Sequence, residues 1–270
     1  MDTGSGPQKT PPVEGAPCEG GGTWKLLFQG SMTLNRSTIQ GVKEMLGTTL
    51  PKLDSKGMTV QPWTSNPDKM GRQEVKELVA KLQNECRKAY PAGQGFNTLH
   101  DAEIVHAARL IFRSPLVLPD EEQDAYVADV AALLKAVAYA EIGLDQNEEG
   151  KKKHPERTGN DTCEVSGPLA GGFLQVIPAT SFEHCSGMNL LIPRYGIQCG
   201  AKEMVRYATM SKVGGSLGLV MASYNMGYYR LQGRGMVPFE DTIAYTKKII
   251  GAWAWFREHG LNSEPKLKLK

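Results

Sequence analysis

One carboxylate stands out in this sequence because of the residues that precede it. Apolar residues recur at three- and four-residue spacing from Val127 to Ala138, on one face of a helix, and Glu141 takes the next position on that face. Burial raises the pKa of a carboxyl group, and one that stays protonated near neutral pH can act as a general acid. The alternative is a glutamate that turns outward at a frayed helix end or pairs with a lysine.

The segment AGGFLQVIPAT, residues 170–180, is a second candidate, since it mixes an apolar stretch with residues that are unusual in one. Gly171 and Gly172 allow something to approach the backbone closely, and Pro178 prevents a helix from continuing through. Gln175 places an amide among apolar neighbours. That amide either hydrogen-bonds to a ligand or to the backbone of the core.

Helices are the elements that must position these residues. The helix carrying Glu141 is predicted to begin after Pro119 and to end at Gly143. Apolar periodicity predicts further helices from Arg72, around 104–111, and at 201–213, 216–224 and 239–257. Because the C-terminal 200 residues show no convincing β-alternation, the predicted fold class is mostly α.

The composition excludes some classes of function. The 270 residues include 31 basic and 29 acidic side chains, a net charge of +2, which gives no electrostatic reason to expect a nucleic-acid partner. The lysine runs at 151–153 and 266–270 are typical of a solvated loop and tail. No stretch approaches the roughly 20 apolar residues of a membrane helix, so no transmembrane segment is predicted.

The five cysteines show no CxxC spacing, so nothing in their arrangement supports a metal site. Three of them lie within 163–199, which favours a disulfide if the protein is exported. An odd count leaves at least one unpaired in a monomer. Cys86 is the candidate, because it falls on the apolar face of a predicted helix and is interpreted as a core thiol.

The chain is predicted to consist of four parts. Residues 1–22, rich in Gly and Pro, are interpreted as a disordered linker, and 23–118 as an accessory region with a helical extension packed on the catalytic domain. Residues 119–258 form that domain, and 259–270 a polar tail. No signal peptide is visible, so the protein either stays inside the cell or is a mature form with a replacement methionine.

Four short motifs follow one another between residues 120 and 255. A helix ends in AYAEIG, and SGPLAGGFLQVIP, SYNMGYY and EDTIAYTKKI follow it. In this order they resemble the motifs of the SLT-type lytic transglycosylases, which share the lysozyme-like superfamily with the goose-type lysozymes. Glu141 matches the family's catalytic glutamate, although Ile142 replaces the usual serine. Met226 stands in place of alanine, and Asp241 in place of glutamate.

The resemblance implies a lysozyme-like helical domain and a substrate, the glycan strand of peptidoglycan. Glu141 would be the single acid/base that cuts between N-acetylmuramic acid and N-acetylglucosamine and leaves a 1,6-anhydro product. No metal or cofactor is implied. In such proteins the glycine-led segment lines the cleft, and the implied substrate-binding residues are Ser166, Gly172, Phe173, Gln175, Tyr224, Asn225 and Tyr245. Tyr224 and Tyr245 have a second interpretation as packing aromatics.

Two other functions remain open at this level. A hydrolytic lysozyme needs a second carboxylate to activate water, and the long acidic loop after the catalytic helix offers Glu156, Asp161 and Glu164. A bond from Cys163 to Cys185 would hold this loop as a lid. An inactive glycan-binding envelope scaffold is the third interpretation. The implied setting is periplasmic or secreted, and the implied state is a monomer.

Overall fold

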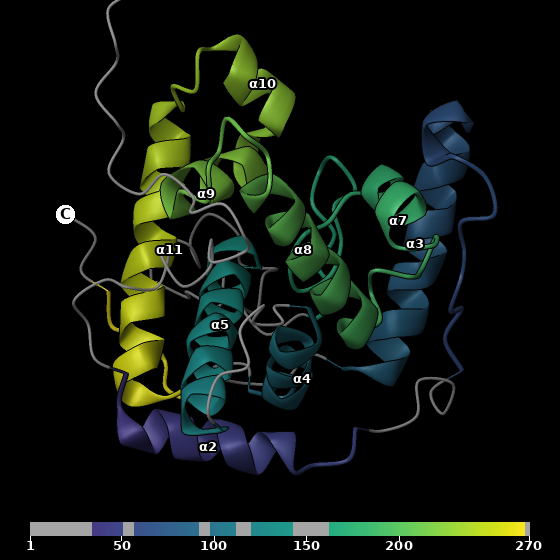
Figure 1. The fold of residues 1–270 in the computed structure, drawn as a ribbon. Coiled ribbons are helices and arrows are strands. Elements are labelled where there is room, and N and C mark those ends of the chain that lie inside the picture. Colours follow the sequence, from purple (N-terminus) through teal and green to yellow (C-terminus); the bar gives the residue numbers. More distant parts are fainter. Residues whose placement is uncertain (1–33, 51–56, 92–97, 112–119, 143–161, 268–270) are drawn as a thin grey trace, which may run out of the picture.

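The computed structural model describes residues 34–50, 57–91, 98–111, 120–142 and 162–267. Within these ranges the protein is built of helices, with isolated β-bridges and no strand, which confirms the predicted mostly α class. Figure 1 shows the arrangement. In chain order the helices are α2 (Arg36–Leu46), the short 3₁₀-helix η2 (Pro67–Lys69), α3 (Arg72–Ala89), α4 (Asp101–Ile111), α5 (Asp120–Glu141), α7 (Pro178–His184), α8 (Pro193–Ala208), α9 (Leu217–Met226), α10 (Tyr228–Gly233) and α11 (Glu240–His259).

Helix α5 lies at the centre of the molecule. Its residues from Val127 to Tyr139 are all buried, so the helix is enclosed on every side and not only along one stripe. Helices α4 and α11 pack along it, and α2 crosses one end of this group (Figure 1). This packing holds Glu141, the last residue of α5, in a fixed place at the end of the core.

Buried charges join α5 to its two main neighbours. Asp129 of α5 accepts hydrogen bonds from Trp253 and pairs with Arg257 at 2.9 Å, both on α11. Lys135, fully buried in α5, contacts the carboxylate of Asp101 at the start of α4. A buried charge is costly unless it is paired, so each contact restricts how the neighbouring helix can sit.

Two disulfides are present among the described residues, in pairings that the sequence did not predict. Cys86 bonds to Cys163, so Cys86 is not the unpaired thiol predicted for it. Cys185 bonds to Cys199, and the expected bond from Cys163 to Cys185 is wrong. The physical reason is that the buried face of α3 turns Cys86 toward the loop that carries Cys163, and both pack in one cluster with Leu191.

Parts predicted as separate regions share one core. Val42 of α2 and Ile104 of α4 belong to the same buried cluster as α5 and α11. After α11 the chain packs back on the body: Leu261 is buried, and Ser263 accepts a hydrogen bond from Trp255. The segment 1–22 lies outside the described residues. No helix among the described residues has the length and apolarity that crossing a bilayer requires.

Candidate active site

Glu141 is the last residue of α5, and a tyrosine of α11 holds its carboxyl group. Tyr245 of α11 donates a hydrogen bond from its hydroxyl to Oε1 of Glu141 at 2.5 Å. The next residue, Ile142, is buried, whereas Glu141 itself keeps part of its surface exposed. The structure therefore brings together two site residues that were predicted from the sequence and that lie 104 positions apart. The side chain of Glu141 is partly buried and partly exposed.

The surroundings set the protonation state of this carboxyl group. Burial raises the pKa of Glu141 to about 7, opposed by the Tyr245 hydrogen bond and by the positive charge of Lys248. A carboxyl group with such a raised pKa can exist in both its protonated and its ionised form near neutral pH. Lys248 was missed by the sequence analysis, although it lies one helical turn after Tyr245 on the same face of α11.

Tyr224 connects the glutamate to the segment 170–180. Its hydroxyl donates to the backbone oxygen of Leu174 at 2.6 Å. Burial, with the nearby charges of Glu141 and then Glu203, raises the pKa of Tyr224 well above its usual value, so the hydroxyl stays protonated. Gly200 of α8 makes room for it, because a Cβ there would stand 2.8 Å from that hydroxyl oxygen.

The loop that leads into this segment folds back on itself. Bridges pair Val165 with Gly171 and Gly171 with Val176. Gly172 adopts a φ of +74°, and a Cβ there would lie 2.3 Å from the backbone oxygen of Leu190. What approaches Gly172 closely is thus the protein's own chain, where the family resemblance implied a sugar.

Gln175 anchors this loop and still leaves one group available. Its Nε2 donates to the backbone oxygens of Glu164 and Gly172, at 3.1 and 3.0 Å. The residue has a φ of +46°, in the left-handed region that is unfavourable for a side chain other than glycine. Among the described residues none donates to Oε1, so this oxygen is the part of Gln175 that a ligand can use.

Phe173 and Ser166, two further residues predicted to bind substrate, contact other parts of the protein. Phe173 is fully buried, with its ring packed edge-on against His100, so its side chain belongs to the core. The hydroxyl of Ser166 faces the backbone oxygen of Ala170 at 3.5 Å. No hydrogen bond joins Phe173 or Ser166 to Glu141 within the part of the chain that the structure describes.

The candidates for a second carboxylate divide in two. Glu156 and Asp161 lie outside the described residues. Glu164 is half-buried. Its backbone oxygen accepts hydrogen bonds from the backbone N–H of Gly172 and from the side-chain amide of Gln175.

Asn225 borders an open hollow beside the glutamate. Its Oδ1 accepts a hydrogen bond from the Thr242 hydroxyl at 2.9 Å. The hollow has a volume of about 550 Å³ and is lined by Asn225, Met226, Arg230, Phe239, Glu240, Asp241 and Thr242. Thr242 and Tyr245 lie three residues apart on one face of α11, so the hollow is about one helical turn from the tyrosine that holds Glu141.

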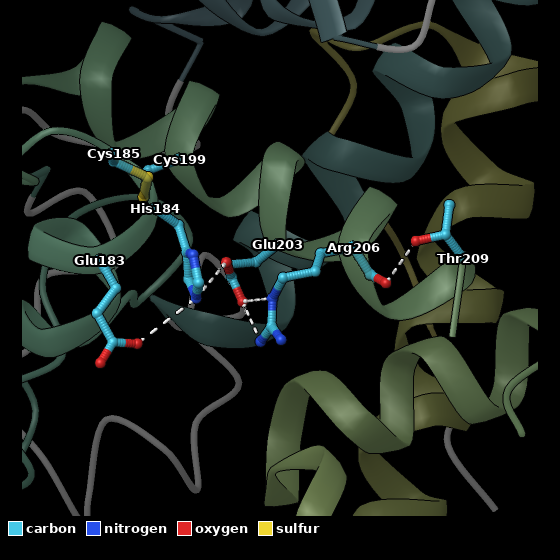
Figure 2. A network of polar contacts seen from close by, with 7 residues as sticks. All are labelled: Glu183, His184, Cys185, Cys199, Glu203, Arg206 and Thr209. Atoms are coloured by element: carbon cyan, nitrogen blue, oxygen red, sulfur yellow. Dashed lines mark hydrogen bonds and ion pairs between the residues drawn. A yellow bond between two sulfur atoms is a disulfide. The ribbon is translucent and has the colours of Figure 1, made fainter. Parts of the chain in front are cut away.

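A network of polar contacts joins α7 to α8 (Figure 2). Glu203, buried on α8, accepts two hydrogen bonds from Arg206 at 2.9 and 2.7 Å. His184 of α7 approaches the other oxygen of Glu203 at 3.9 Å, next to the Cys185–Cys199 bond that ties α7 to α8. Nothing in the sequence pointed to Glu203 beyond its spacing of three residues from Arg206.

Comparison with protein-family models, with curated proteins and with solved structures found no match for this chain. Among the described residues, no group of three or more His, Cys, Asp or Glu side chains is placed to hold a metal ion. The case for a function therefore depends on the residues and contacts of the chain itself.

Proposed function

We propose that this protein is a lytic transglycosylase that cleaves peptidoglycan glycan strands between N-acetylmuramic acid and N-acetylglucosamine. One observation carries the proposal: a single carboxyl group, that of Glu141, has a pKa near 7 under the hydroxyl of Tyr245. The four ordered sequence motifs supply the substrate class, and both of these residues belong to them.

The reaction requires one residue that first gives and then takes a proton. Protonated Glu141 donates to the glycosidic oxygen while the sugar ring gains oxocarbenium character. The resulting carboxylate then accepts the proton of the muramic 6-hydroxyl, whose oxygen attacks C1 and closes the 1,6-anhydro ring. The Tyr245 hydrogen bond stabilises the charged form between these steps. The Oε1 of Gln175 and the amide of Asn225 are the groups we assign to binding sugars.

Transglycosylation is favoured over hydrolysis by the electrostatic neighbours of Glu141. Among the described residues, the groups that act on its pKa are Tyr245 and Lys248, a hydroxyl and a cation. An inverting hydrolase needs a second carboxylate roughly 6.5–9.5 Å away to activate water. A reaction that uses the substrate's own hydroxyl needs no such group.

The disulfides support an extracytoplasmic place of action. Two such bonds form within the described residues, and disulfides persist mainly in oxidising compartments. We propose that the protein works in the periplasm or after secretion, where peptidoglycan is accessible.

Mass spectrometry of fragments released from purified peptidoglycan tests the proposal. Wild-type protein should release fragments with anhydromuramic ends, and Glu141→Gln should release none. Glu258→Gln, at an exposed glutamate on the far end of α11, is the matched control and should retain activity. Reducing muramic ends would instead establish a lysozyme and direct attention to Glu156 and Asp161. Binding without release by the wild type would establish a scaffold.

A further inference from the structure

The hollow beside Glu141 has a chemical character different from that of a sugar-binding cleft. Its lining includes one cation, Arg230, and two carboxylates, Glu240 and Asp241, next to the ring of Phe239. Neutral sugars are usually held by hydroxyl, amide and aromatic groups. Charges of both signs, close together on an open surface, complement a ligand that itself carries carboxylate and ammonium groups.

The contact of Arg230 with the ring of Phe239 restricts the arginine side chain. Its guanidinium lies over the ring of Phe239, 4.7 Å from the centroid, a cation–π contact that limits its freedom before any ligand arrives. No carboxylate of the described residues forms an ion pair with it, so its hydrogen-bond donors are available. Arginine donors match a carboxylate in a two-pronged geometry.

A second arginine, Arg234, differs from Arg230 because it does not line the hollow. Arg234 lies over the same ring at 4.0 Å, but its Nε donates to the backbone oxygen of Val237 and it does not line the hollow. The two side chains are both exposed and both stack on Phe239. Arg234 is therefore a matched control for Arg230.

The position of the hollow relates it to the muramic residue. Thr242 lines the hollow and precedes Tyr245 by three residues, about 4.5 Å along the helix axis. A substituent on a muramic ring placed at Glu141 is therefore within reach of the hollow. In peptidoglycan that substituent is the stem peptide, which carries free carboxylates and, where a diamino acid is present, an ammonium group.

We propose that this hollow binds the stem peptide of the substrate, with Arg230 pairing to a peptide carboxylate, and that the protein prefers peptide-bearing strands to bare ones. The inference rests on the proposed function. Arg230 is then a specificity determinant and not part of the bond-breaking chemistry.

The test compares two substrates made from one peptidoglycan preparation: strands with their peptides, and strands stripped of them by an amidase. Wild-type protein should cleave the peptide-bearing strands with a kcat/KM roughly tenfold higher, as one charge-assisted contact allows. Arg230→Gln should lose this advantage and cleave stripped strands at the wild-type rate. Arg234→Gln should match the wild type on both substrates.

Equilibrium binding gives a second readout that does not depend on turnover. Glu141→Gln should bind peptide-bearing strands more tightly than the double variant Glu141→Gln/Arg230→Gln, and the two should bind stripped strands equally. Equal cleavage of both substrates by the wild type would overturn the inference, as would an Arg230→Gln defect of the same size on both. If the wild type releases no fragment from either substrate, it is the proposed function that fails, and this inference with it.

Discussion

Opposing influences act on the carboxyl group of Glu141, and the balance between them decides what it can do. Burial favours the protonated form, while the hydroxyl of Tyr245 and the charge of Lys248 favour the ionised form. Burial outweighs the other two influences and raises the pKa from its ordinary value of 4.5 to about 7, where proton donation and proton acceptance are both accessible. Burial alone would keep the group protonated and unable to act as a base.

Replacing Tyr245 with phenylalanine should shift this balance in a measurable direction. Loss of a hydrogen bond to the charged form raises the pKa of Glu141 further, so the alkaline decline of kcat/KM, at about pH 7 in the wild type, should move to higher pH. The maximal rate should fall roughly tenfold, because the carboxylate formed by proton donation is less stable. A pH–rate profile on peptidoglycan fragments measures both effects.

Tyr195→Phe is the control for this experiment, since Tyr195 is half-buried in a different cluster beside α3. Its profile should coincide with that of the wild type. An unchanged alkaline limb in Tyr245→Phe would show that Tyr245 does not act on the protonation of Glu141.

At the scale of elements, the loop from Cys163 to Val176 forms one wall of the site through its backbone. Its own carbonyl groups accept the amide hydrogens of Gln175, and another of its carbonyl groups, at Leu174, accepts the Tyr224 hydroxyl. Gly172 permits this arrangement because the carbonyl of Leu190 occupies the space of a side chain. The wall therefore depends on close backbone packing more than on side-chain contacts.

Gly172→Ala should accordingly destabilise the protein. The new Cβ would meet the Leu190 oxygen at 2.3 Å, in a backbone conformation with a φ of +74° that alanine disfavours. We expect a loss of at least about 2 kcal/mol in the free energy of unfolding, measured by urea denaturation. Gly167→Ala, at an exposed position of the same loop with no atom within 4 Å of the new Cβ, should change it by less than about 0.5 kcal/mol.

Comparison of sequence and structure shows which elements local patterns can reveal. The sequence pattern placed α5 and α11 well, because both are long helices, of 22 and 20 residues. Helix α8 begins at Pro193, eight residues before the predicted start. Gly196 and Gly200 lower the helix propensity of this stretch, yet the structure uses both for close packing against Leu190 and Leu174.

The candidate site was predictable to the extent that its residues lie on periodic elements. Glu141 and Tyr245 meet because their two helices pack together, which the apolar faces indicate. The double carbonyl contact of Gln175 depends on the exact path of a turn, and a local pattern does not specify that path. The partner of Cys86 lies 77 residues away, where only the folded arrangement brings it close.

At the scale of the whole molecule, the disulfides join surrounding elements to the site. Cys86–Cys163 attaches α3 to the start of the loop that forms the wall, and Cys185–Cys199 attaches α7 to α8. Helix α5 carries no disulfide and is held by apolar packing and by its two buried charge pairs. The core thus supports Glu141, while covalent bonds hold the loop 163–176 and the helices α7 and α8.

The two bonds should contribute unequally to stability. In the chain-entropy model, closing 77 residues stabilises by about 4.5 kcal/mol and closing 14 residues by about 3 kcal/mol. Cys86→Ala/Cys163→Ala should therefore lower the free energy of unfolding more than Cys185→Ala/Cys199→Ala, as measured by chemical denaturation. The reverse order would mean that strain or residual structure in the unfolded chain outweighs loop closure.

Glu141 follows a run of buried residues, whereas most of the residues that line the hollow are exposed or half-buried. Glu141 ends the most enclosed helix of the protein, where nearly every neighbour is constrained by packing. The lining of the hollow comes from α9, α10 and the first turn of α11, where Arg230, Glu240 and Asp241 are all exposed. Divergence at these surface positions is compatible with an unchanged core. Under the proposed function, a mutant library confined to residues 228–241 could therefore be selected for activity on cell walls of different chemistry while Glu141 and Tyr245 stay unchanged.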